Sequence, residues 1–102
     1  MRNAADENQV KKASEKDRFS REQELLDVKN ILSTPHGRRF IWRYLGLAGV
    51  FRLSFTGNSE TFFNEGQRNI GLKILDDVME SSPESYVLMS EEARGKEIKE
   101  QI

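Results

Sequence analysis

Two prolines, each preceded by a hydroxyl residue, divide this chain of 102 residues into helical segments. A proline disfavours the helical conformation in the residue before it, and it suits the first position of a new helix, because its missing N–H is not needed there. Thr34 before Pro35 and Ser82 before Pro83 can also supply capping hydroxyls. The sequence therefore predicts that one helix ends and another begins at each of these two breaks.

Apolar residues at helical spacing locate the first two helices. Ser20 and Gln23 form a capping-box pattern, so the first helix is expected to begin at Ser20 and to end before Pro35. The second helix begins at Pro35 and is closed by Gly46 and Gly49. Because the break between them is short, these two helices are expected to form an antiparallel hairpin.

A third helix is expected from Ser59, its predicted cap, to about Met79. It contains Gly66 and Gly71, and an interior glycine costs a helix roughly 1 kcal/mol relative to alanine. Both glycines are therefore interpreted as points where helices pack closely. The predicted core face of this helix consists of Phe63, Ile70, Ile74, Leu75 and Val78.

Two segments are harder to assign. Residues 50–58 alternate apolar and polar side chains as a strand does, but no partner strand is apparent, so an extended connection laid on the core is preferred. A helical segment follows Pro83, and Ser90 is the candidate start of a final helix with few apolar residues.

The predicted fold class is all-α: a small bundle of about four helices with a polar N-terminal arm and a solvated C-terminal helix. In residues 1–18 the only large apolar residue after Met1 is Val10, so this arm is expected to be disordered or ordered by a partner. Residues 19–89 form the helical domain and residues 90–102 the helical tail. Hydrophobic residues make up 36% of the chain, against roughly 45–50% in typical domains, which indicates that some apolar contacts are made with a partner.

Several classes of function lack support in the sequence. There is no cysteine, which excludes disulfides and cysteine-ligated metal sites. The only histidine, His36, has no nucleophile or carboxylate at a catalytic spacing, and Asp76, Asp77 and Glu80 are interpreted as a solvated acidic face rather than a metal site. Apolar runs are far shorter than the roughly 20 residues that cross a bilayer. No catalytic residue, metal, cofactor or membrane contact is predicted, and the protein is expected not to be an enzyme.

Charge is unevenly distributed, although the net charge is only -1. No acidic residue lies between Asp27 and Glu60, whereas residues 56–102 carry ten acidic and five basic residues. A basic middle and an acidic end would let copies of the chain pack head to tail, so a homo-oligomer is expected.

The second predicted helix carries the candidate binding surface. Arg39 and Arg43 are one turn apart, and Arg38 lies one turn before Trp42. Trp42 projects away from the face of Phe40 and Tyr44 and is the expected exposed anchor, since interfaces favour tryptophan and arginine as hot spots.

Three interpretations of these arginines stay open. They pair with Asp76, Asp77 and Glu80 or with another subunit, they hold the phosphates of a nucleic acid whose base stacks on the indole, or they form an ordinary solvated face. Glu65 and Arg68 are a second candidate pair, either structural or partner-binding.

Three segments, Gly37–Leu45, Thr61–Leu72 and Pro83–Tyr86, resemble the Bbp19-like phage domain family of short-tailed bacteriophages and prophages. The resemblance covers roughly residues 34–89, and its most distinctive part is the pattern Glu-Gly-x-Arg-x-x-Gly-Leu at residues 65–72. It implies a setting in the virion-assembly module, near the genes for capsid and portal proteins. It implies no catalytic residue.

The resemblance and the residue patterns together predict a non-enzymatic virion-assembly or structural protein, of the portal and head–tail connector kind. It is expected to bind portal, capsid or internal core proteins in multiple copies, and to be located in the virion after synthesis in the host cytoplasm. The alternative is a small nucleic-acid-binding phage protein. The predicted partner-binding residues are Arg38, Arg39, Trp42, Arg43, Glu65 and Arg68, and the predicted helix-packing residues are Gly66 and Gly71.

Overall fold

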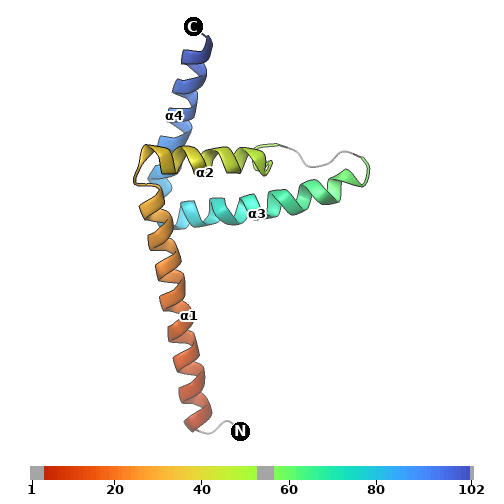
Figure 1. The fold of residues 1–102 in the computed structure, drawn as a ribbon. Helices are drawn as coiled ribbons and strands as arrows, with labels where there is room; N and C mark the ends of the chain where they lie inside the picture. Colours follow the sequence, from red (N-terminus) through yellow and green to blue (C-terminus); the bar gives the residue numbers. More distant parts are fainter. Residues whose placement is uncertain (1–3, 53–56, 102) are drawn as a thin grey trace.

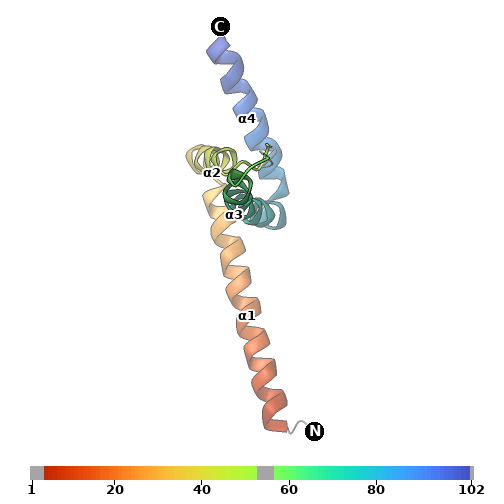
Figure 2. The same ribbon diagram turned by 90° about the vertical axis from the view of Figure 1, so that its right-hand side faces the viewer.

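A computed structural model describes residues 4–52 and 57–101, and the described residues are all-α, as predicted. The helices are α1 (Ala4–Ile31), α2 (Pro35–Leu47), α3 (Glu60–Ser81) and α4 (Pro83–Gln101). The helices that form a hairpin are α2 and α3, so the predicted antiparallel hairpin of the first two helices is wrong (Figure 1). This hairpin projects sideways, and α1 and α4 leave its base in opposite directions (Figure 1, Figure 2).

Both proline breaks are helix boundaries, as predicted. Thr34 has extended backbone angles, φ -119° and ψ 148°, and its Oγ1 accepts a hydrogen bond from the N–H of Gly37 at 3.2 Å. At the second break the buried Ser82 donates its hydroxyl proton to Glu84 Oε1 at 2.9 Å. Since a hydroxyl has one proton, Ser85 Oγ is the donor in its 2.6 Å contact with Ser82 Oγ.

Two of the predicted serine caps are wrong, and a third is right in position only. Ser20 lies inside α1 and Ser90 inside α4, because strong helix formers on both sides carry each helix through the serine. Ser59 precedes α3, but its side chain makes no capping hydrogen bond. Asn58 supplies one instead, since its Oδ1 accepts from the N–H of Glu60 at 2.9 Å.

The N-terminal arm is helical in the structure, and the predicted connection at 50–58 lies partly outside the described residues. Residues 4–20 belong to α1 and are exposed throughout. A polar helix of this length is marginal in water on its own, so ordering by a partner stays the prediction for this arm. The connection predicted for 50–58 falls partly on residues 53–56, outside the described residues.

The core is small and the molecule is flat. Its buried centre is formed by Leu32, Val78 and Met89, with Val28, Ile41, Trp42 and Tyr86 packed against it. The radius of gyration is 19.0 Å, against about 13 Å for a compact chain of this length. The extents are 69 × 39 × 15 Å, so the thinnest dimension is little more than the roughly 10–12 Å diameter of one helix.

The two glycines of α3 have different surroundings. A Cβ added at Gly71 would lie 2.5 Å from Val50 Cγ2 and 2.6 Å from Ala48 Cβ, so α3 approaches the end of α2 closely there. A Cβ added at Gly66 would meet none of the described residues within 4 Å. The prediction of close packing within the chain is therefore wrong at Gly66.

Candidate protein-binding surface

Arg38, predicted to lie on the partner surface, is held inside the fold. Its Nε donates to Glu92 Oε1 at 2.6 Å and its Nη1 donates to the carbonyl oxygen of Leu32 at 3.0 Å. The side chain is only 13% exposed. Arg38 therefore connects α2 to α4, and the surface prediction is wrong for this residue. Its ion-pair partner is also on α4 rather than on the third helix, where the acidic partners were expected.

Trp42 is half-buried rather than an exposed anchor. Its ring centroid lies 5.1 Å from that of Phe51 and 6.1 Å from that of Tyr86. Phe40 and Tyr44, on the other side of α2, are the exposed aromatic residues. The prediction is wrong because α2 has apolar residues around most of its circumference, and its contact with α4 selects the Trp42 side as the inward one.

The outward side of α2 combines arginine and apolar side chains. The guanidinium carbon of Arg43 lies 5.7 Å from the ring centroid of Phe40 and 5.1 Å from that of Tyr44. Arg39 is exposed and, within the described part of the chain, makes no ion pair. Leu47 is exposed at the end of the helix. We call this surface the α2 face: Arg39, Phe40, Arg43, Tyr44 and Leu47.

The acidic residues of α3 pair with α1 instead of α2. Arg21 Nη2 donates to Asp77 Oδ1 and to Glu80 Oε2, both at 2.8 Å, and its Nη1 donates to Glu24 Oε2 at 3.0 Å. The hydrogen bonds that Arg21 donates to the carboxylates of Glu80, Asp77 and Glu24 raise its pKa above the ordinary value. No local pattern predicts this contact, because Arg21 and its α3 partners are more than fifty residues apart.

The N-terminal half of α3 presents apolar side chains to solvent. Phe62 is 82% exposed, Phe63 67% and Ile70 58%, so Phe63 and Ile70 are not core residues, contrary to the prediction. Gly66 lies on the same side, one turn from Phe62 and one turn from Ile70. The first fully buried residue of α3 is Gly71. We call this surface the α3 face: Phe62, Phe63, Gly66 and Ile70.

Glu65 and Arg68 are half-buried and lie on the side of α3 away from the α3 face. Within the described residues Arg68 Nε is buried and has no hydrogen-bond partner. A role for these two residues in binding a partner stays a prediction.

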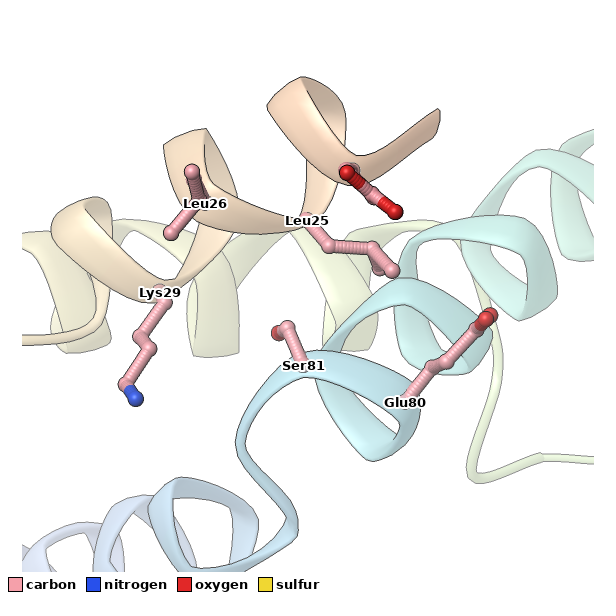
Figure 3. A pocket seen from close by; sticks show the side chains of 6 residues that line it. Leu25, Leu26, Lys29, Glu80 and Ser81 are labelled. Carbon is pink, nitrogen blue, oxygen red and sulfur yellow. The ribbon is translucent and has the colours of Figure 1, made fainter. Parts of the chain in front are cut away.

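An open pocket of about 400 Å³ lies where α1 meets α3 (Figure 3). It is lined by Glu22, Leu25, Leu26, Lys29, Glu80 and Ser81. The mixture of two leucines with charges of both signs is typical of a helix junction, and the hydroxyl of Ser81 donates to the carbonyl oxygen of Val78 rather than to a carboxylate.

The described residues also bear on metal binding and on membrane insertion. In the ranges 4–52 and 57–101, no group of three or more histidine, aspartate or glutamate side chains could hold a metal ion. Among the helices of these ranges, none has the length and apolar character needed to cross a bilayer.

A comparison with protein families finds one match. The family described as Bbp19-like phage protein matches residues 28–91, which is more than half of the chain. This range runs from the C-terminal end of α1 into α4 and includes both the α2 face and the α3 face. Comparisons with curated proteins and with solved structures gave no match.

Proposed function

Because this chain belongs to the family of Bbp19-like phage proteins, we propose that it is a non-enzymatic virion-assembly or structural protein. It acts by binding other virion proteins, such as the portal, the capsid or an internal core protein, and it is present in multiple copies. Its place of action is the virion.

The observation that carries this proposal is the large surface that the chain leaves uncovered. Its accessible surface is 8092 Å², about 2,200 Å² more than the roughly 5,900 Å² of a compact protein of 11.8 kDa. A typical stable interface removes about 800 Å² from each partner. The excess is therefore sufficient for more than one protein contact, and large apolar side chains make up part of it.

The α2 face is the surface that we assign to the virion partner. Arginine and aromatic residues are enriched among the residues that dominate binding energies, and Arg43 over the rings of Phe40 and Tyr44 has this composition. Arg39 adds a positive charge that no described residue neutralises. The partner is therefore expected to present an acidic surface with an apolar centre.

Quantitative mass spectrometry of purified particles, compared with particles emptied of DNA, tests the proposal. A fixed copy number in both preparations would support a structural component, and loss on emptying would support an ejected internal protein. Absence from both would contradict the proposal. The double variant Arg39→Glu/Arg43→Glu is expected to lower the copy number, whereas Lys96→Glu/Lys99→Glu on α4, an equal change of charge away from the α2 face, is expected to leave it unchanged.

Nucleic-acid binding is the second candidate, because Arg39 and Arg43 lie beside exposed aromatic rings that could stack on bases. The structure supports nucleic-acid binding less than the sequence does, because Arg38 and Trp42, two of the four predicted residues, face inward. Its signature would be an affinity for single- or double-stranded DNA that falls steeply with salt and is lost in Arg39→Ala/Arg43→Ala with the fold retained. Arg38 is left intact in this test because its removal would break the contact with Glu92.

A further inference from the structure

We propose that the α3 face pairs with the α3 face of a second copy of this chain, with the two α3 helices antiparallel and crossing at Gly66. The pairing rests on the proposed assembly in multiple copies, and it names the surface through which two copies meet.

The α3 face is exposed, as such a contact requires. Phe62 is 82% exposed and Phe63 67%, which is unusual for two adjacent phenylalanines in a folded chain. Ile70, one turn beyond Gly66, is 58% exposed. These side chains can therefore meet a second copy without any rearrangement of the helices.

The residue pattern of the α3 face is symmetric about Gly66. Phe62 lies four residues before it and Ile70 four residues after it. In a two-fold contact, residue i of one copy meets residue j of the other and the reverse also holds. An antiparallel crossing at Gly66 therefore places Phe62 of each copy against Ile70 of the other.

Gly66 itself is explained by this arrangement. Glycine in the middle of a helix is destabilising, and no described residue of this chain would lie within 4 Å of a Cβ at this position. The fold of a single chain therefore does not require glycine there. At the crossing point of two helices, the missing side chain lets the two backbones approach closely and lets the flanking phenylalanines reach across.

Charge distinguishes the occupant of the α3 face from that of the α2 face. None of the four residues of the α3 face is ionisable. The α2 face carries Arg39 and Arg43, so pairing it with a second copy of itself would bring like charges together. The α3 face is thus the one of the two that suits a contact between identical chains.

Sedimentation or light scattering of the full chain, from about 1 to about 100 μM, tests the pairing, since this range resolves a Kd of micromolar order. The expected mass is that of a dimer, twice 11.8 kDa. Gly66→Leu is expected to raise the Kd by about ten- to a hundredfold, because an extra side chain at the crossing separates the helices. Gly95→Leu on α4 is the matched control: it too is a helical glycine whose Cβ would meet nothing within 4 Å, and its Kd is expected to be unchanged.

Two results would overturn the pairing. One is a monomer over the whole concentration range, which would assign the α3 face to a different protein. The other is a dimer that Gly66→Leu and Phe62→Ser both leave intact while circular dichroism shows normal helix content, which would place the contact elsewhere. A monomer that is nevertheless found in particles at a fixed copy number would overturn the pairing and leave the proposed function standing, so the two failures can be told apart.

Discussion

Replacing Gly71 with alanine tests the close approach of α3 to the turn that follows α2. The new Cβ would lie 2.5 Å from Val50 Cγ2 and 2.6 Å from Ala48 Cβ, and Gly71 is buried, so a neighbour has to move. Overpacking of this kind costs about 1–3 kcal/mol. The better helix propensity of alanine offsets at most about 1 kcal/mol of it. We therefore expect the free energy of unfolding to fall by about 1–2 kcal/mol, and the Tm to fall by roughly 5–15 °C for a domain of this size.

Urea denaturation followed by circular dichroism measures the change, at one protein concentration so that association does not alter the comparison. Gly95→Ala is the control, because its Cβ meets nothing within 4 Å and it is expected to gain up to about 1 kcal/mol. Adding Ala48→Gly to Gly71→Ala removes one of the two close contacts and should restore part of the loss. A Gly71→Ala protein as stable as the original chain would refute the argument from close approach.

Three further perturbations test the ion pairs and the second proline break. Arg38 Nε lies 2.6 Å from Glu92 Oε1, and the Arg38 side chain is mostly buried. Arg38→Ala should therefore lower the free energy of unfolding by about 2 kcal/mol. A double-mutant cycle with Glu92→Ala should give a coupling of at least about 0.5 kcal/mol. Arg21→Ala should lower the free energy of unfolding only slightly, and by less at high salt, because the Arg21 side chain is 38% exposed and its ion pairs are screened. The N–H of Glu84 and the hydroxyl of Ser82 lower the pKa of the Glu84 carboxyl. The Glu84 carboxylate therefore contributes its full stability above the ordinary pKa of about 4.3, and this contribution is lost as the pH falls through the lower pKa of the folded state. Glu84→Gln should remove this part of the pH dependence of stability, which urea denaturation at a series of pH values measures.

The proline breaks could be predicted from the sequence because their physics is local. A proline restricts the residue before it, and Thr34 needs only a neighbouring N–H to act as a cap. Ser20 and Ser90 carry the same capping chemistry but not the break in the backbone that makes a cap useful. A capping motif without a proline or glycine beside it was therefore not sufficient to place a helix end in this chain.

The inward side of α2 could not be predicted, because it depends on contacts with distant residues. Apolar side chains surround most of this helix, so the periodicity gave no unique core face. The side that faces inward is the one where Arg38 reaches Glu92, 54 residues away, and where Trp42 meets Tyr86. The pairing of Arg21 with Asp77 has the same cause, since it depends on how α1 crosses α3.

The difference in charge between the two faces also restricts how an assembly of this protein can grow. A two-fold contact between α3 faces uses the same surface on both copies, so it is closed once two chains have met. The α2 face cannot extend the assembly by pairing with itself, because Arg39 and Arg43 would oppose each other. In the proposed arrangement, growth beyond two chains comes from the virion protein that binds the α2 face. The copy number in a particle would therefore be set by the symmetry of that partner, and it should be even if both copies of each pair are retained.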